Sequence, residues 1–312
     1  MTFRIQTEET VDAAVRRIAS EQIDKAVKEI NNPSIGRHET VHQVRKRCKK
    51  IRGLVRLVRP PLGDLYKSEN ARYRDAAREL SGIRDAGAQL ECFEALAETF
   101  RAPFADGAFD AIRGELEDRK QRVLREQQDF DVKLENFVEE VEAGKQSARS
   151  WELSGTGYRA IEGGLRKTYC RGRRAMEAAY ADPSDENFHE WRKRVKYHRY
   201  HTRLLRDIWP PVMQPLRKEL KQLSDLLGDD HDLAILKQTL LDDPDAFGPK
   251  RDLQAFLGLI DRRRAELQAM AGTLGQRVYA EKPKSFVRRL GRYWQAWRDE
   301  SRRPSPKLVG QS

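Results

Sequence analysis

The chain has 312 residues, enough for one large or two small domains, and its 60 lysines and arginines exceed its 49 aspartates and glutamates, giving a formal charge of +11. This balance favours a polyanionic partner, whether nucleic acid, inorganic polyphosphate or acidic lipid. The three cysteines, Cys48, Cys92 and Cys170, are far apart in sequence and form no CxxC pair, which argues against a zinc ribbon or disulfide framework and favours a reducing cytoplasm.

The first half of the chain has the periodicity of amphipathic helices. The opening MTFRIQTEET lacks the apolar core of a signal peptide, and no run of about 18 apolar residues follows, so we expect no membrane span. Proline and glycine mark most of the predicted helix ends. We expect helices at residues 7–30, 41–59, 71–82, 86–100 and 109–141, the last with a break near Asp129.

The second half repeats this order after a boundary rich in glycine and serine at residues 144–157. We expect helices at residues 158–180, 188–206, 216–227, 232–240, 251–274 and 282–300, and a disordered tail from Ser301. Alternating patterns typical of strands do not occur at useful length. The sequence therefore predicts an all-α protein built from two helical bundles related by internal duplication.

A basic helix occurs twice in the chain. His42 begins the string HxxRKxxKxxR, and His189, 147 residues later, begins the same string. On a helix, the repeated histidines and cations fall in one sector about 120° wide, and an apolar stripe lies opposite. The stripe consists of Val41, Val44, Cys48, Ile51, Val55 and Val58 in the first copy and of Phe188, Trp191, Val195 and Leu205 in the second.

Both copies carry almost no negative charge, since residues 41–59 contain no carboxylate and residues 188–206 contain only Glu190. A solvated helix normally mixes both signs to form i,i+4 pairs, and like charges on one face repel one another unless an anion is bound. A single basic helix is most often a solvated face. The repeated order of His, Arg and Lys favours anion binding instead, whereas Arg47, Lys50 and Arg194 lie off the stripe and resemble ordinary solvated charges.

These segments resemble the CHAD family, the conserved histidine α-helical domain. The resemblance rests on the two HxxRKxxKxxR helices and is strengthened by LLGDDHDLAIL at 226–236, YCRGRRAMEAAY at 169–180 and EKPKSFVRRLGRYWQAW at 281–297. It implies one domain over residues 6–298, with helical halves at about 6–146 and 155–298. Two four-helix bundles would meet about a pseudo-two-fold axis, with the two histidine helices lining a central basic groove or pore.

The resemblance also implies a non-enzymatic protein that binds inorganic polyphosphate without a cofactor and associates with cytoplasmic polyphosphate granules. Arginine suits phosphate as a bidentate fork, and lysine as an adaptable point charge. Protonated histidine would strengthen the contact as pH falls. The implied contacts are His42, Arg45, Lys46, Lys49, Arg52 and Arg56 in one half and His189, Arg192, Lys193, Lys196, Arg199 and Arg203 in the other, with Arg16, Arg173, Arg174, Lys282 and Lys284 as second-tier candidates.

Two other functions remain open. A nucleic-acid-binding module could stack bases on interleaved aromatic residues, but Trp191 falls on the apolar side and only Tyr200 shares the cationic sector. A metal-dependent phosphohydrolase could use residues 229–232, Asp-Asp-His-Asp, yet these fit a helix cap after Gly228 better. Metal binding at the repeated histidines is disfavoured because their neighbours are cations. His198 aligns with Ile51 and fits a core histidine, and His201 aligns with Leu54 outside the repeated set.

Overall fold

The computed structural model describes residues 3–80, 82–104, 107–126 and 129–302. Every regular element within these residues is helical, which confirms the predicted all-α class. None of these helices is long and apolar enough to cross a membrane. The elements are α1 (Val11–Ile30), α2 (Arg37–Leu57), α3 (Arg59–Leu62), α4 (Leu65–Glu79), α5 (Gly82–Thr99), α6 (Arg101–Phe104), α7 (Asp110–Glu126), α8 (Phe130–Arg149), α9 (Arg159–Ala181), α10 (Asp185–Leu204), α11 (Pro210–Asp242), the 3₁₀ helix η1 (Pro244–Phe247), α12 (Lys250–Val278) and α13 (Pro283–Arg302).

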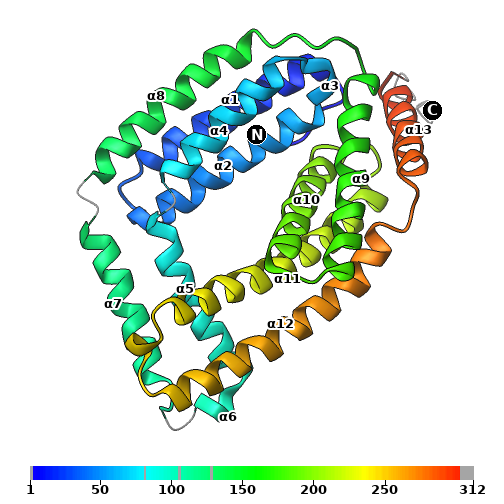
Figure 1. The fold of residues 1–312 in the computed structure, drawn as a ribbon. Helices are drawn as coiled ribbons and strands as arrows, with labels where there is room; N and C mark the ends of the chain where they lie inside the picture. Colours follow the sequence, from blue (N-terminus) through cyan, green and yellow to red (C-terminus); the bar gives the residue numbers. More distant parts are fainter. Residues whose placement is uncertain (1–2, 81, 105–106, 127–128, 303–312) are drawn as a thin grey trace, which may run out of the picture.

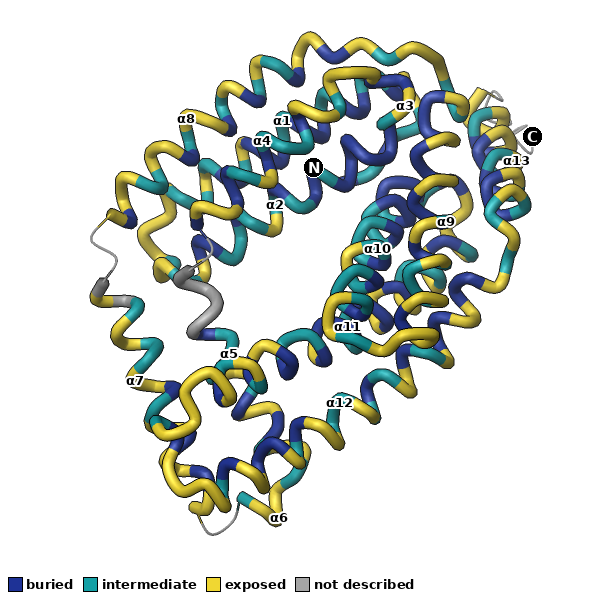
Figure 2. The backbone as a smooth tube through the Cα atoms, in the orientation of Figure 1, coloured by how far each residue is buried: buried dark blue, intermediate teal, exposed yellow. Residues whose placement is uncertain are grey.

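The helices form three groups around two hydrophobic cores (Figure 1). One group contains α1, α2, α4 and α8, and a second contains α9, α10 and α13 with the nearer ends of α11 and α12. These two groups share the larger core. The far ends of α11 and α12 pack with α5, α7 and η1 around the smaller core (Figure 2). The two halves of the sequence are therefore joined at both cores.

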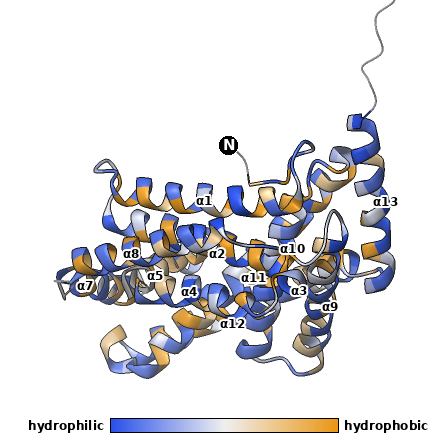
Figure 3. Ribbon diagram, turned by 90° about the horizontal axis from the view of Figure 1, so that it is seen from above, coloured by the Kyte–Doolittle hydropathy of each residue, from blue (hydrophilic) through white to orange (hydrophobic). Residues whose placement is uncertain are grey.

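Local sequence explains where several helices begin. The Thr10 side chain caps α1 by accepting a hydrogen bond from the Ala13 amide at 3.2 Å. Ser184 caps α10 in the same way through the Asn187 amide at 3.2 Å. Along the longer α-helices, hydrophobic and hydrophilic residues alternate in the way that gives an amphipathic helix one apolar face (Figure 3). The apolar stripes predicted for the duplicated helices are confirmed, because Val44, Cys48, Trp191 and Val195 are at most 1% exposed.

The segment from Pro210 to Asp242 differs from the prediction. The sequence analysis expects two helices there, with Asp229 or Asp230 capping the second, but α11 runs without interruption through both residues. An internal glycine such as Gly228 costs a helix about 1 kcal/mol. That cost is offset because leucines at helical spacing on either side of Gly228 enter both cores. The two cores thus hold one long helix together across its weak point.

Three further predictions concern segment ends. The long charged helix does break near Asp129, which occupies the N-cap position of α8. The boundary predicted at 144–157 is shorter, because α8 continues through Gly144 to Arg149 and leaves only residues 150–158 before α9. The tail predicted from Ser301 begins inside α13, which ends at Arg302, and residues 303–312 lie outside the described residues.

The three charges predicted to be solvated are not simply exposed. Arg47 forms an ion pair with Glu29, and Arg194 forms one with Glu190. Lys50 is only 5% exposed, and burial lowers the pKa of its amine to about 7. The prediction of ordinary solvated charges is wrong, because the position of a residue around its helix does not show which side chains a neighbouring helix places beside it.

The contact between α9 and α2 depends on a glycine. A Cβ at Gly164 would stand 2.0 Å from the carbonyl oxygen of Leu57, which is backbone and cannot rotate away. We expect Gly164→Ala to lower the free energy of unfolding by about 2–3 kcal/mol in urea denaturation. The control is Gly258→Ala on α12, where a Cβ meets nothing within 4 Å. It should raise stability by up to about 1 kcal/mol, since alanine is the better helix former. A Gly164→Ala protein of wild-type stability would contradict this packing.

Candidate polyanion-binding site

The two duplicated helices pack directly against each other. A Cβ at Gly53 on α2 would lie 3.0 Å from the Cβ of Tyr200 on α10, so a larger residue would push the two helices slightly apart and glycine favours this close approach. Nε2 of His201 lies 3.0 Å from the Gly53 carbonyl oxygen, a distance at which the imidazole N–H donates to it. Because α2 and α10 touch at this point, their cationic stripes can face a common space.

That space is a cavity of about 300 Å³, here called the basic cavity. It is lined by Arg45, Lys49 and Arg52 of α2, by His189, Arg192, Lys193, Lys196, Tyr197 and Tyr200 of α10, by His231 and Asp232 of α11, and by Ala88 of α5. Six of these side chains are cationic and one is a carboxylate. The structure therefore brings seven of the site residues predicted from sequence to one cavity.

The arginines of the basic cavity are held in place by neighbouring acceptors. Arg45 donates through Nη1 to the Ala77 carbonyl oxygen at 3.0 Å, and Arg52 donates through Nε to Oδ1 of Asn70 at 3.3 Å. Nη2 of Arg192 lies 3.7 Å from Oδ1 of Asp232. A guanidinium has five N–H donors, so each arginine that is anchored in this way keeps others for a ligand. Cationic groups fixed beforehand lose less entropy when an anion binds.

Two histidines meet at the side of the basic cavity. Nδ1 of His189 lies 3.2 Å from Nδ1 of His231, so one ring donates and the other accepts. Burial lowers the pKa of His189, and the nearby Lys193 and Arg192 lower it further. Burial and then Arg192 lower the pKa of His231 to about 3. Both rings are therefore neutral at pH 7, and an anion that offset the surrounding cations would raise both pKa values.

Some lining residues were missed in the sequence analysis. The sequence predicts a helix cap at Asp229 or Asp230 and no ligand contact at His231 or Asp232, and Tyr197 falls outside the cationic sector of its helix. The Asp-Asp-His-Asp string is a usable signal, because it places four consecutive polar residues between the leucine-rich stretches of one long helix. What the sequence could not supply is the crossing of α10 and α11, which places His231 beside His189.

Several predicted contacts do not line the basic cavity. Lys46 is exposed, and its amine donates to Gln43 Oε1 at 3.2 Å. Arg56 is 8% exposed, and its guanidinium lies 4.0 Å from the centroid of the Tyr197 ring. His42, Arg199 and Arg203 belong to the same two helices but are likewise not part of the lining.

The second-tier candidates are scattered. Arg16 donates to the Trp151 carbonyl oxygen at 2.7 Å and so joins α1 to the segment after α8. Arg173 pairs with Glu177 at 3.1 Å, and Arg174 is exposed on the same helix, α9. Lys282 and Lys284 line a separate hollow between α9 and α13. None of these five residues lines the basic cavity, so their positions do not support a role in binding a ligand there.

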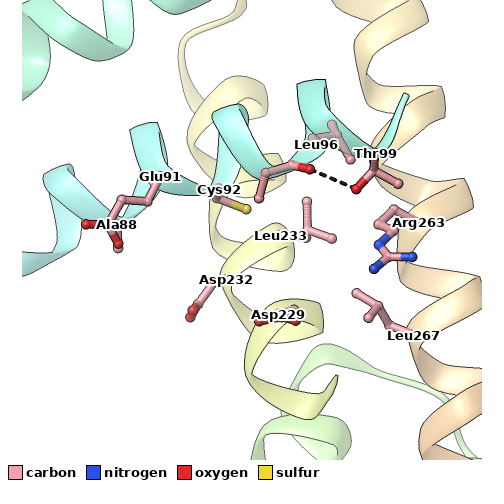
Figure 4. Close-up of a pocket in the computed structure, with 11 residues that line it drawn as sticks. Ala88, Glu91, Cys92, Leu96, Thr99, Asp229, Asp232, Leu233, Arg263 and Leu267 are labelled. Atoms are coloured by element: carbon pink, nitrogen blue, oxygen red, sulfur yellow. Dashed lines mark hydrogen bonds between the residues drawn. The ribbon is translucent and has the colours of Figure 1, made fainter. Parts of the chain in front are cut away.

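A second cavity, of about 210 Å³, lies between α5, α11 and α12 (Figure 4). Asp232 and Ala88 line both cavities, but here the other charged residues are Glu91, Asp229 and Arg263. Burial and then the charge of Asp232 raise the pKa of Asp229. With three carboxyl groups and one guanidinium, this second cavity would repel a polyanion. Asp232, which lines both cavities, therefore lies at the boundary between the basic cavity and this acidic one.

The residues that suggested a phosphohydrolase do not act together, because Asp230 is used in a structural contact while His231 and Asp229 line different cavities. Oδ1 of Asp230 accepts hydrogen bonds from Arg264 at 3.0 Å and from Gln268 at 2.8 Å, which joins α11 to α12. Burial raises the pKa of the Cys92 thiol to about 12, which removes it as a nucleophile at neutral pH. Among the described residues, no three His, Cys, Asp or Glu side chains converge so that they could hold a metal ion.

Comparison with known proteins identifies the family and the fold. The family model described as "CHAD domain" matches residues 17–241. Among solved structures, PptA from Streptomyces chartreusis is similar with a TM-score of 0.61 and 14% sequence identity. The match covers 88% of this chain and 100% of the PptA chain. At that identity the likeness shows a shared fold. No curated protein matches the chain.

Proposed function

Because the chain belongs to the CHAD domain family, we propose that it binds inorganic polyphosphate in the basic cavity between α2 and α10. The observation that carries the proposal is the convergence of six cationic side chains from both copies of the duplicated motif. Polyphosphate presents only phosphate oxygens, so its recognition needs forks and point charges but no base-edge contacts. Three arginines and three lysines supply both kinds of group.

Contacts between α2 and α10 support the internal duplication and a local pseudo-two-fold axis. Gly53 lies against Tyr200, the residue 147 positions later that occupies the same place in the second copy of the motif. Arg56 lies over the ring of Tyr197. The counterparts of these two residues, Arg203 and Lys50, are close enough that Arg203 lowers the pKa of Lys50. A two-fold axis passing between Gly53 and Tyr200 would exchange the members of these residue pairs. The basic cavity would then be the predicted central groove.

Aromatic packing favours polyphosphate over nucleic acid, the second candidate ligand. Trp191 is fully buried, and the Tyr197 ring is covered by the Arg56 guanidinium at 4.0 Å. The Tyr200 ring packs against Gly53 and lies 6.0 Å from the ring of Phe3. Single-stranded nucleic acid is usually bound by stacking its bases on accessible rings. Trp191 is therefore out of reach, and Tyr197 and Tyr200, although they line the basic cavity, each already pack against another residue. We propose a phosphate-only ligand and a role at polyphosphate granules in the cytoplasm.

A titration with long-chain polyphosphate, in parallel with single-stranded RNA at two salt concentrations, tests this function. We expect polyphosphate to bind more tightly than RNA and to remain bound when RNA is added in matched amounts. Affinity should fall steeply between about 50 and 200 mM salt, because counterions are released on binding as they are from DNA. Release of polyphosphate by RNA would favour the nucleic-acid reading. Release of phosphate during the titration in the presence of a divalent metal would favour the hydrolase.

A further inference from the structure

A second concentration of positive charge lies outside the basic cavity, in a hollow of about 1,110 Å³ between α9 and α13. We call it the α9–α13 groove. Its cationic residues are Arg159 and Arg166 of α9, Lys282 just before α13, and Lys284, Arg288 and Arg292 of α13. Its one carboxylate is Glu162. The charge ratio is the same as in the basic cavity, although the two share no lining residue.

The two helices present their cations as facing rows. Lys284, Arg288 and Arg292 recur every fourth residue, so they stand about 6 Å apart along one side of α13. Arg159 and Arg166 are seven residues apart and share one side of α9. Tyr158 fixes the spacing of the two rows, because its hydroxyl donates to the Val287 carbonyl oxygen at 2.6 Å. The groove is therefore a built feature of the α9–α13 packing.

None of the six cations in the groove forms an ion pair in the part of the chain that the structure describes. Elsewhere exposed cations do so, as Lys221 does with Asp225 and Arg262 with Glu266. On α13 itself, Nε of the neighbouring Arg289 contacts Glu281 at 3.1 Å, outside the groove. Facing rows of like charge repel one another, and a bound anion would relieve that repulsion.

We propose that the α9–α13 groove is a second, independent binding site for a segment of polyphosphate, an inference that rests on the proposed function. The shape is open and elongated along two helices, which suits a linear chain. Within the described chain, Tyr158 is the single aromatic residue in the lining of the groove, and its hydroxyl is held by α13, so the groove has no series of rings on which successive nucleobases could stack. A linear polymer of phosphate is the ligand that matches these groups.

The second site gives the protein a dependence on polyphosphate length. α9 lies between α10 and α13, so the groove and the basic cavity are on different sides of α9 (Figures 1 and 3). A chain long enough to reach both sites binds the second one as an intramolecular event, with affinity gained and no new contact required. Short chains would instead occupy the two sites separately, with two equivalents per protein.

Calorimetric titration of the full chain with short polyphosphate of defined length tests this inference. The groove variant is Arg288→Glu with Arg292→Glu, and the cavity variant is Lys49→Glu with Lys196→Glu. The control is Lys221→Glu with Arg262→Glu, which changes net charge equally at exposed positions on other helices. We expect two equivalents bound by the wild type and the control, and one by each of the other variants. Long polyphosphate should bind the groove variant at least tenfold more weakly than the control.

The outcomes separate the inference from the proposed function. If the groove variant matches the control and the cavity variant binds nothing, the second site is overturned while the proposed function stands. If the cavity variant matches the control and the groove variant binds nothing, the proposed function fails and the groove is the polyphosphate site. Because Arg288 and Arg292 are exposed and form no ion pairs within the described chain, their replacement should not affect folding, which circular dichroism would check.

Discussion

Replacing Lys49 and Lys196 together by glutamate should weaken the binding of short polyphosphate to the basic cavity by at least about 100-fold. The two lysines are counterparts in the duplicated motif, and both line the cavity. The change leaves four cations facing three carboxylates in place of six facing one. A hydrogen bond to a charged group contributes about 1.5–3 kcal/mol, so losing two of them costs about 3–6 kcal/mol before repulsion is counted. Short polyphosphate isolates this effect from the α9–α13 groove, and calorimetry would measure it.

A matched control separates position from net charge. Lys46 lies three residues before Lys49 on α2 but is exposed and does not line the basic cavity. Lys46→Glu combined with Lys221→Glu changes the net charge by the same amount, and we expect a loss of less than about tenfold, because both side chains are exposed to solvent and neither lines the cavity. Equal losses in the two double variants would mean that binding depends on overall charge, and the placement of the site in the cavity would then be wrong.

The helices and their buried faces could be predicted because both depend on local sequence. Spacing of apolar residues placed Val44 and Trp191 in the core, and the Thr10 and Ser184 caps follow from side-chain chemistry within one turn. The continuity of α11 could not be predicted. Gly228 and the polar residues after it are unfavourable locally, and the two cores that hold the helix straight are assembled from distant segments.

The candidate site was predictable as a chemical pattern but not as a shape. The repeated motif identified the cations, yet only the crossing of α2 and α10 separates the lining Lys49 from the exposed Lys46. Gly53 lies at that crossing, where its lack of a side chain allows Tyr200 to approach closely. The sequence alone does not show that Tyr200 packs there. In the same way, Lys282 and Lys284 were grouped with the motif by resemblance, whereas the packing of α13 on α9 puts them in another groove.

A large effect on stability is expected at mildly acidic pH, and two of the groups that cause it are histidines behind the basic cavity. His198 and His201 are both 0% exposed. The His198 ring lies among the rings of Tyr169, Tyr279 and Phe286, at centroid distances of 5.4–5.6 Å. Burial lowers the pKa of each imidazole from 6.5 to about 3. The rings around His198 supply no carboxylate that could stabilise a positive charge. The folded protein therefore keeps the His198 imidazole neutral.

The sign of the pH dependence follows from these values. In the unfolded chain each histidine takes up a proton as the pH falls below about 6.5, whereas in the folded protein it does so only near pH 3. Stability is therefore complete above about pH 6.5 and decreases as the pH falls toward 3. At pH 5 each group favours the unfolded state by about 2 kcal/mol relative to neutral pH, so the pair removes about 4 kcal/mol. Marginal stabilities of about 5–15 kcal/mol make this a large loss.

Urea denaturation of the wild type and of His198→Leu at pH 7.5 and pH 5 measures the effect. The variant should lose about 2 kcal/mol less than the wild type between the two pH values, whatever its stability at neutral pH. Thr202→Val is the control, because Thr202 is 1% exposed in the same helix and does not titrate. It should shift stability equally at both pH values. If His198→Leu keeps the full pH dependence of the wild type, the acid sensitivity arises from other groups, and a neutral His198 in the folded core is not its cause.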